Sequence, residues 1–526
     1  MTSPHAANRQ IARSAGTVMI ALALSQISNL VFTVLSARAF GAGHAMDVFA
    51  AANRVPETLF KLMAAGALGS AFIPTFAGLL TRDERQTAWK LASAIANLLF
   101  VGVSLAAVLA GIFAQPLVRY LLAPGFAADP ALEAQTIHLM RLMLPSAVVF
   151  SLSGLVMGIL NAHRVFFIPA LTPSMYRLGL IFGVLFLAPR MGVEGLAWGV
   201  LLGASMHLLC QLPSLWRLKG AYIPSFGLKL PAVRAVGRLM LPRLFGVAVV
   251  ELNFWVNANL ASRMAAGSII GLNWAFMIML MPQAVIAQAV ATAALPTLSA
   301  QYALGKLDDV RASLAASLRG ILLLAFPAAL GLILLRQAIV ALMLQYGNFD
   351  RQDTDIVAWA LLWYAAGLVG HCVVEILARA FYALHDTKTP VLVGAAAMGL
   401  NAVLSVAFAR GFAQIGWLPH GGLALANSLA TALEAAGLIV LMRQRLNGLH
   451  GRSVLALTAR AALAALAMGG MLWAWLSLSM PAWLLALGGV ALGGAVYLLA
   501  TWLLGVDEVH RAGGIVLRRV GISRKR

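Results

Sequence analysis

The sequence predicts an all-α integral membrane protein with fourteen transmembrane helices, arranged as two six-helix lobes related by an internal repeat, plus two extra C-terminal helices. Hydrophobic residues make up 61% of the 526 residues and charged residues only 11%, with a mean hydropathy of +0.88. Soluble domains carry about twice that share of charge. Because backbone groups in lipid must be satisfied internally, and the apolar runs show no period-2 alternation, we expect helices and not barrel strands.

Three phrases recur along the chain at a nearly constant offset. AFIPTFA around Pro74 returns as AALPTLS around Pro296, and APGF with Gly125 returns as QYGNF with Gly347, both after 222 residues. ILNAHRVFFIPAL returns as FYALHDTKTPVLV after 221 residues. The constant order and offset indicate two copies of one unit, and duplicated halves around a central site are a common plan for membrane transporters.

Fourteen apolar segments are each long enough to cross a bilayer, which takes ~20 residues. The first, at 15–37, is predicted to act as a signal anchor. Helices 1–6 form one copy and helices 7–12 the other, so both copies share one orientation and a symmetry axis along the membrane normal. The predicted spans are 15–37, 48–79, 90–113, 136–160, 168–188, 194–215, 240–262, 269–298, 317–343, 356–382, 390–411, 421–442, 455–478 and 482–504.

This pattern predicts a division of the chain into five parts. Residues 1–215 form an N-lobe, 216–243 a cytoplasmic linker between the lobes, and 244–444 a C-lobe. Residues 445–506 hold the last two helices, and 507–526 form a basic tail. A cleft between the lobes is the expected ligand site.

Lysines and arginines concentrate in the tail and in the loops that follow even-numbered spans, while the opposite loops hold few. By the positive-inside rule this imbalance places both termini in the cytoplasm. The net charge of +20 is therefore interpreted as a topology signal and as an attraction to anionic phospholipids. Nucleic acid is not an expected partner.

Ionisable side chains inside spans mark candidate sites, because each costs about 2.5–3.5 kcal/mol to insert at the membrane centre. In the second span Asp47, Arg54 and Lys61 recur at intervals of seven, so they share one helix face. Glu57 lies between Arg54 and Lys61 and can pair with either. The stripe is predicted to line a polar cavity, and internal ion pairing is the alternative.

Other spans carry isolated charges. In the tenth, Glu375 lies one turn before Arg379 and is a candidate proton or cation site, or a partner for another helix. Arg177 lies midway into the fifth span and Glu434 midway into the twelfth. Glu251 opens the seventh span.

Amides on neighbouring helices give Glu251 a possible ligand set. With Asn401 and Asn427 it could bind a monovalent cation, and hydrogen bonding between helices is the alternative.

The sequence argues against an enzyme. It has no GxxxxGK[ST] loop for ATP, and its His and Cys residues never cluster at metal-ligand spacing. No cofactor or metal is therefore expected, and transport would be coupled to a monovalent cation, to the membrane potential or to the substrate's own gradient.

Several phrases resemble the MurJ/MviN lipid II flippases of the MOP transporter superfamily, in the same order along the chain and over the same fourteen-span plan. Two of them, FGAG-x-x-x-D and FYAL-x-D-x-K-T-P, are fairly specific to the family. The matching phrases are ARAFGAGHAMDVFAAANRVPETLFKLMAAGALGSAFIPTFA (37–77), LLAPGF (121–126), GILNAHRVFFIPALTP (158–173), ALPTLS (294–299), LQYGNFD (344–350) and ARAFYALHDTKTPV (378–391).

The resemblance implies a bacterial cytoplasmic-membrane protein with two lobes that form a V and open alternately to either side. It implies a cationic cavity that holds the pyrophosphate and head group of lipid II, and a groove for the polyprenyl tail at the last two helices. Other cell-wall synthesis proteins are implied as partners. Asp47 and Arg54 match family positions, and Lys61 stands where the family usually has arginine.

The chain also departs from the family pattern. Where the family's first helix has two arginines and an aspartate, this chain has Gln26, Phe32 and Thr33. Where the eighth helix has an arginine and a nearby glutamate, it has Phe276 and Met279. Cations expected to grip a pyrophosphate are therefore missing, and Arg177 is a candidate replacement.

The leading interpretation is a flippase for an undecaprenyl-pyrophosphate-linked cell-wall precursor. Arg54 and Lys61 would hold the phosphates with Arg177 as a compensating cation, and Asp47 would act as a gate. One alternative is an exporter of another lipid-linked glycan, or a cation-coupled drug antiporter that uses Glu251, Glu375 or Glu434. A non-transporting membrane scaffold is the other alternative.

Overall fold

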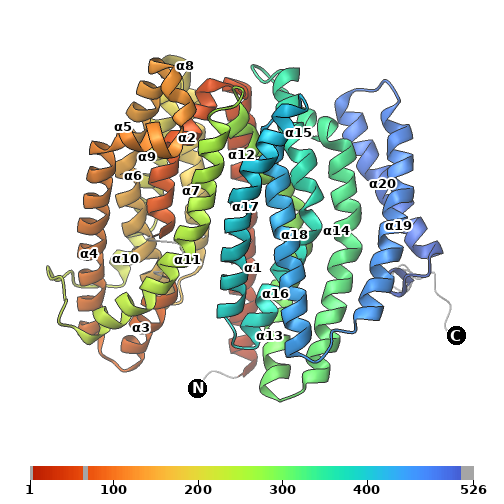
Figure 1. The fold of residues 1–526 in the computed structure, drawn as a ribbon. Coiled ribbons are helices and arrows are strands. Elements are labelled where there is room, and N and C mark those ends of the chain that lie inside the picture. The colour runs from red at the N-terminus through yellow and green to blue at the C-terminus, as the bar shows by residue number, and fades with distance from the viewer. Residues whose placement is uncertain (1–3, 63–68, 511–526) are drawn as a thin grey trace. The chain divides into compact units, whose positions relative to one another are not determined.

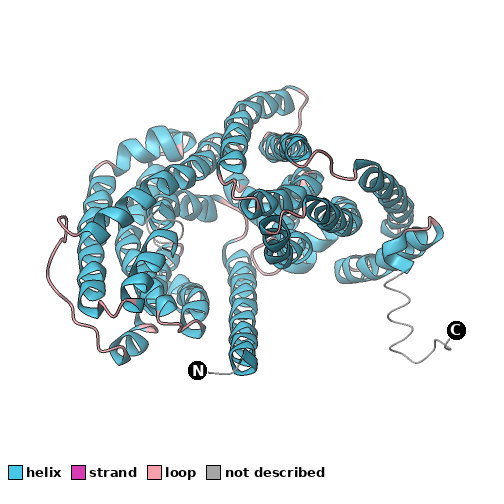
Figure 2. Cartoon of the chain, turned by 90° about the horizontal axis from the view of Figure 1, so that it is seen from below, coloured by secondary structure: helices cyan, strands magenta, loops and turns pink. Residues whose placement is uncertain are grey.

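The computed structural model describes residues 4–62 and 69–510, and every regular element in this part of the chain is a helix (Figures 1 and 2). Residues 511–526 of the predicted basic tail lie outside the described residues. The chain divides into two compact units, one of Met1–Ile270 with Tyr346–Phe349, the other of Gly271–Gln345 with Asp350–Arg526.

Among the described residues, the first unit contains eight long helices and several short ones. The long helices are α1 (Pro4–Phe40), α2 (His44–Phe60), α3 (Gly69–Thr81), α4 (Arg85–Ile112), α6 (Pro130–Ala162), α7 (Phe167–Phe182), α9 (Glu194–Leu209) and α11 (Pro231–Ala261). The short helices are α5 (Ala114–Pro116), η2 (Leu117–Leu122), η3 (Pro124–Ala128), η4 (Gly183–Leu187), α8 (Ala188–Met191) and α10 (Leu212–Arg217).

The second unit begins within α12 and holds the remaining helices. They are α12 (Ser268–Gln283), η5 (Ala284–Gln288), α13 (Ala289–Ala303), α14 (Leu307–Leu344), α15 (Arg351–Ala366), α16 (Leu368–Ala383), α17 (Lys388–Gln414), α18 (His420–Arg445), α19 (Gly451–Leu476) and α20 (Ala482–Leu503).

Both units use the same neighbour pattern. In the first, α4 packs against α3 and α6, α6 packs against α3 and α9, and α9 packs against α7. In the second, α14 packs against α13 and α15, α16 packs against α13 and α18, and α18 packs against α17. The pair α19 and α20 packs on α14.

The repeated phrases occupy matching places in these patterns. Pro74 lies inside α3 and Pro296 inside α13. Pro169 is the third residue of α7, and Pro390 is the third residue of α17. Proline is tolerated in the first turn of a helix because its missing N–H would have no intrahelical partner there.

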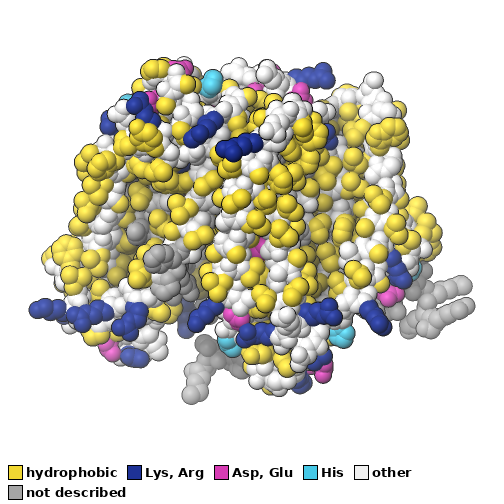
Figure 3. Space-filling model, viewed as in Figure 1, with side chains coloured by type: hydrophobic (Ala, Val, Ile, Leu, Met, Phe, Trp, Pro, Cys, Tyr) yellow, Lys and Arg dark blue, Asp and Glu magenta, His cyan; other side chains and the backbone are white. Residues whose placement is uncertain are grey.

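The multi-pass character predicted from composition is confirmed. Within the described residues, ten helices are long and apolar enough to cross a membrane, and two bent helix pairs raise the number to twelve. One bent pair is α15 with α16, which meet at an angle of 49°. The exposed surface of the helices is largely apolar, as lipid contact requires (Figure 3).

A close helix crossing fixes the position of α7. Gly203 of α9 lies against the backbone of Tyr176 and Gly179, where a β-carbon would overlap with main-chain atoms. Small residues allow such backbone contact in membrane proteins, where packing rather than the hydrophobic effect holds helices together. The crossing therefore fixes how far α7 is shifted along its axis relative to α9 and how it is rotated about that axis. It thereby also fixes the position of Arg177, the residue after Tyr176.

Gly203→Ala is expected to lower the free energy of unfolding by about 1–3 kcal/mol, because the added methyl group overpacks the α7–α9 crossing. Unfolding in mixed detergent micelles with rising dodecyl sulfate measures the change. Gly102→Ala is the matched control, because nothing lies within 4 Å of a β-carbon at that exposed helical glycine. Equal stability of the two variants would contradict a tight crossing.

Candidate functional site

The charged face of α2 is divided between two environments. Asp47 lies in the first turn of the helix and is only 2% exposed, and Arg54 is 9% exposed. Glu57 and Lys61, towards the other end, keep about a third of their side-chain surface open, at 36% and 31%. A ligand can therefore contact the charged groups of Glu57 and Lys61 at this partly exposed end of α2.

Asp47 caps the beginning of another helix. Its Oδ2 accepts a hydrogen bond from the Gly267 N–H at 2.7 Å, and its Oδ1 accepts one from the Ile270 N–H at 2.8 Å. Gly267 precedes α12 and Ile270 lies in its first turn; N–H groups at the start of a helix have no intrahelical acceptor, and the helix dipole favours a negative charge beside them. Asp47 thus ties the first turn of α2 to the start of α12.

Lys61 is held between two carboxylates. Its Nζ lies 2.9 Å from Glu57 Oε1 and 3.1 Å from Glu251 Oε1, and Glu251 is almost fully buried. The Thr58 hydroxyl donates to Glu251 Oε2 at 3.3 Å, and Trp255 Nε1 donates to the same hydroxyl at 2.9 Å. Glu251 therefore compensates a cation of α2 from the neighbouring helix α11.

Arg54 and Lys61 share an aromatic partner. The Phe254 ring lies 5.4 Å from the Arg54 guanidinium carbon and 5.5 Å from Lys61 Nζ. The negative face of an aromatic ring stabilises cations at this distance. Phe254, three residues after Glu251, was not predicted from the sequence, where only the polar residues around it stood out.

Arg177 reaches the same region from α7. Its guanidinium lies over the rings of Phe32 at 5.6 Å and Tyr176 at 5.3 Å. Glu57 interacts electrostatically with Lys61, Arg54 and Arg177. We call the five residues Arg54, Glu57, Lys61, Arg177 and Glu251 the charged cluster.

The charged cluster suits an anionic ligand. When all five groups are ionised, three cations face two carboxylates. Two of the cations are guanidinium groups, which match phosphate oxygens with parallel hydrogen bonds. For the described residues, no group of three or more His, Cys, Asp or Glu side chains could hold a metal ion.

The charged residues of the second unit are arranged differently. Glu375 pairs with Arg379 within α16, and His371 Nε2 lies 3.1 Å from Asn427 Oδ1 of α18. Phe276 packs against the rings of Tyr364 and His371. An aromatic cluster thus fills this position.

The amides proposed for a cation site lie in different surroundings. Asn401 is buried within α17, where its Oδ1 accepts a hydrogen bond from the Ser405 hydroxyl at 3.2 Å. Glu434 is half-buried on α18, beside Gly394. Asn401, Asn427 and Glu434 belong to the second unit, whereas Glu251 belongs to the first.

The FYALHDTKTP motif forms a capped helix start. Asp386 accepts hydrogen bonds from the Thr389 N–H at 3.0 Å and the Thr389 hydroxyl at 2.8 Å, and Arg445 Nη1 lies 2.8 Å away. These contacts, the Thr389 N–H first, hold the pKa of Asp386 below its usual range. The motif therefore joins the start of α17 to the end of α18.

A protein-family model described as "Lipid II flippase MurJ" matches residues 36–488 of the chain. The chain belongs to the MurJ family. Over 430 residues it is 31% identical to the lipid II flippase MurJ of Burkholderia cenocepacia, covering 80% of this chain and 82% of that one. Over 517 residues it is 30% identical to the probable lipid II flippase MurJ of Vibrio cholerae, covering 93% and 96%.

Solved structures show the same fold. An inward closed conformation of lipid II flippase MurJ matches with a TM-score of 0.79 at 24% identity, covering 94% of this chain and 99% of that one. An inward-facing MATE-family multidrug resistance transporter of the MOP superfamily matches with a TM-score of 0.68 at 15% identity, covering 82% and 99%. The chain is thus a multi-pass transporter-family protein with the MurJ/MATE fold.

Asp47→Ala is expected to lower the free energy of unfolding by about 1–3 kcal/mol, because the Gly267 and Ile270 N–H groups at the start of α12 lose their acceptor. Asp47→Asn keeps one oxygen acceptor, so its free energy of unfolding should lie between those of Asp47→Ala and the wild type. Detergent unfolding measures both. Glu84→Ala serves as control, because this exposed residue precedes α4 without a side-chain cap; a loss as large as that of Asp47→Ala would contradict the capping role.

A double-mutant cycle of Lys61→Met and Glu251→Gln should give a coupling energy of about 1–3 kcal/mol. The value lies below that of fully buried pairs because Lys61 is partly exposed. The pair Asp308–Arg311, at 3.0 Å and with the Asp308 side chain 88% exposed, is the control, and its coupling should stay under about 1 kcal/mol. Zero coupling between Lys61 and Glu251 would show that the contact does not stabilise the protein.

Proposed function

We propose that this MurJ family member moves lipid II, an undecaprenyl-pyrophosphate-linked cell-wall precursor, from the inner to the outer leaflet of a bacterial cytoplasmic membrane. The observation that carries the proposal is the position of Arg177. Its guanidinium lies over the Phe32 ring at 5.6 Å, and the resemblance to the family implies a charged residue at the position of Phe32. A cation absent from α1 is thereby supplied from α7, and the cluster keeps three cations.

In this proposal Arg54, Lys61 and Arg177 bind the pyrophosphate. Without ligand, Glu57 and Glu251 offset two of the three positive charges, which lowers the cost of holding these cations in a low-dielectric region. A pyrophosphate replaces Glu57 at the partly exposed end, because charge-assisted bonds to phosphate oxygens are strong. Glu57 pairs again with Lys61 when the cargo leaves, which favours release.

Asp47 is the proposed gate. Its two hydrogen bonds to the start of α12 exist only while the outer ends of α2 and α12 are together. Such contacts stabilise the arrangement in which they form and bias the equilibrium against the other. Opening to the outside would break both bonds and expose the two N–H groups of α12 to water.

We infer fourteen spans in the same chain. Two further spans add to the twelve that length and composition select, one formed by α1, of 37 residues, and one formed by α2 together with α3. The shared neighbour pattern of the two units supports a duplication of six helices, with α19 and α20 outside it. The five-part division at 215, 243, 444 and 506 follows, with α19 and α20 as the proposed groove for the polyprenyl tail.

The repeated glycine loops also support a duplication. Gly125 follows the third span and donates its N–H to Ser262 Oγ, at the end of α11, at 3.1 Å. Gly347 follows the ninth span and lies against Arg38 at the end of α1, whose carbonyl accepts the Asn348 N–H at 2.9 Å. Each loop thus contacts the end of the first helix of the other copy.

Native mass spectrometry of the purified protein with lipid II, beside undecaprenyl phosphate and phosphatidylglycerol, tests the proposal. We expect selective lipid II binding, weakened at least about tenfold in Arg54→Ala/Lys61→Ala, because each charge-assisted hydrogen bond contributes more than a factor of ten. Arg177→Ala alone should weaken binding in the same way.

Lys306→Ala/Arg351→Ala is the charge-matched control, because both residues are exposed and lie outside the charged cluster. It should bind lipid II as the wild type does. Binding of lipid II no tighter than of phosphatidylglycerol would overturn the proposed cargo. Unchanged binding in Arg177→Ala would overturn the compensating role while leaving the cargo in place.

A further inference from the structure

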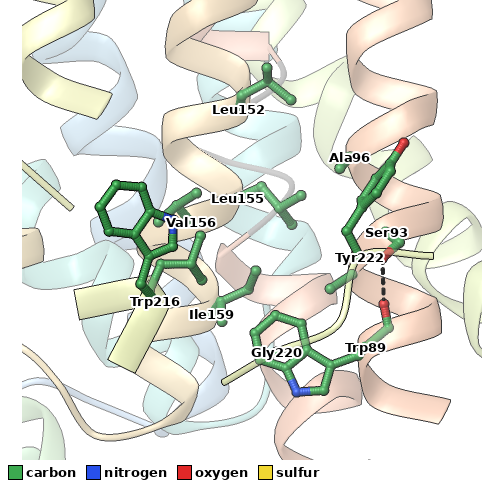
Figure 4. A pocket seen from close by; sticks show the side chains of 12 residues that line it. Trp89, Ser93, Ala96, Leu152, Leu155, Val156, Ile159, Trp216, Gly220 and Tyr222 are labelled. Carbon is green, nitrogen blue, oxygen red and sulfur yellow. Dashed lines mark hydrogen bonds between the residues drawn. The ribbon is translucent and has the colours of Figure 1, made fainter. Parts of the chain in front are cut away.

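A pocket outside the charged cluster lies between α4, α6 and the segment 215–222 (Figure 4). Its volume is about 430 Å³, within the range of small-molecule sites. Figure 4 shows Trp89 at one side and Trp216 at the other, with Leu155 and Ile159 of α6 forming the wall between them. We call this cavity the aromatic pocket.

The segment that closes the aromatic pocket is held in place by specific bonds to α4. Ser93 Oγ accepts the Ile223 N–H at 3.0 Å, and the Tyr222 hydroxyl donates to Asn97 Oδ1 at 2.7 Å. The Asn97 amide in turn donates to the Ser225 carbonyl at 2.9 Å. The pocket is therefore a built feature of the first unit.

Contacts at the start of α4 also hold this segment. Arg85 Nη2 donates to the Leu218 carbonyl at 2.6 Å. Gly220 lies directly on the Trp89 ring, where any β-carbon would overlap with it. The segment around residues 218–220 thus crosses the start of α4 at a fixed place.

The position along the helices puts the entrance at the membrane boundary. Arg85 and Arg217 are terminal residues of two helices apolar enough to span, Arg85–Ile112 and Glu194–Arg217. From Trp89 to Ala96 the pocket follows α4 for about 10 Å towards the apolar interior. Its axis therefore runs from the interface into the region of acyl chains.

The side chains at the entrance match an anionic amphiphile. Trp216 and Tyr222 are 71% and 66% exposed, and such amphipathic rings favour the headgroup level of a bilayer. The segments 82–90 and 216–230 carry six Lys or Arg and two acidic residues. Lys and Arg side chains gather at the lower end of the face that carries α4 and α10 (Figure 3).

We propose that the aromatic pocket binds one acyl chain of an anionic phospholipid, with the phosphate held by Arg85 and Lys219. Apolar walls take the chain, and the cations at the entrance select the charged headgroup over a zwitterionic one. This inference needs only a membrane protein and does not rest on the identity of the transported cargo. The occupied site would fix the linker segment against α4.

Native mass spectrometry of the delipidated full-length protein, titrated with phosphatidylglycerol, phosphatidylcholine and undecaprenyl phosphate in separate arms, tests the proposal. We expect one phosphatidylglycerol to bind more tightly than the rest. Ala96→Phe, which fills the pocket, should weaken that site about tenfold or more, because each excluded methylene costs roughly a factor of four. Arg85→Gln/Lys219→Gln should weaken it while leaving phosphatidylcholine binding unchanged.

Each variant has a matched control. Ala110→Phe makes the same change at another half-buried alanine of α4 that does not line the pocket, and Lys306→Gln/Arg452→Gln removes two exposed cations elsewhere. Both should retain the tight site, as should Arg54→Ala/Lys61→Ala, whose lipid II binding is lost under the proposed function. The cation variant remains informative if Ala96→Phe fails to fold.

Three outcomes would overturn the proposal. Equal binding of phosphatidylcholine and phosphatidylglycerol would show that the cations at the entrance do not select an anionic headgroup. Displacement of phosphatidylglycerol by an equal amount of undecaprenyl phosphate would assign the pocket to a polyprenyl chain. Equal losses in Ala96→Phe and Ala110→Phe would show that no specific pocket binds the lipid.

Discussion

A charge inside a membrane-spanning protein is stable only where other groups of the protein compensate it, and α2 with its C-terminal cap residue Lys61 carries four charges within fifteen residues. Most of the site follows from this constraint. Asp47 is compensated by the N–H groups that begin α12, and Lys61 by carboxylates from α2 and α11. The helices are therefore joined by their charges as well as by packing, and a ligand that brings its own negative charge changes how they are joined.

Aromatic rings extend this compensation without adding charge. Phe254 lies beside two cations, and Phe32 beside Arg177. A ring stabilises a nearby cation but leaves its hydrogen-bond donors available for phosphate oxygens, whereas a carboxylate occupies them. In the proposed site the third cation, Arg177, comes from α7, and its guanidinium lies over the Phe32 ring of α1.

The same physical chemistry separates two kinds of anion site in the first unit. The charged cluster offers guanidinium groups in protein surroundings, next to carboxylates with which an anionic ligand would compete. The aromatic pocket offers apolar walls with cations only at its entrance. The first arrangement suits a head group that must be released, because its own counter-ions compete for the cations. The second suits a lipid that remains bound.

The sequence alone determined the helical membrane fold, because composition and long apolar runs leave helices as the stable choice in lipid. The repeated phrases and the FGAG and FYAL motifs indicated the family, and the seven-residue spacing placed Asp47, Arg54 and Lys61 on one face of α2. Only the tertiary structure decided the partners. That Arg177 meets Phe32, or that Glu251 meets Lys61, depends on how α1, α7 and α11 pack against one another. Contacts between residues more than a hundred positions apart leave no periodic signal in one sequence, so the site's assembly could not be predicted from it.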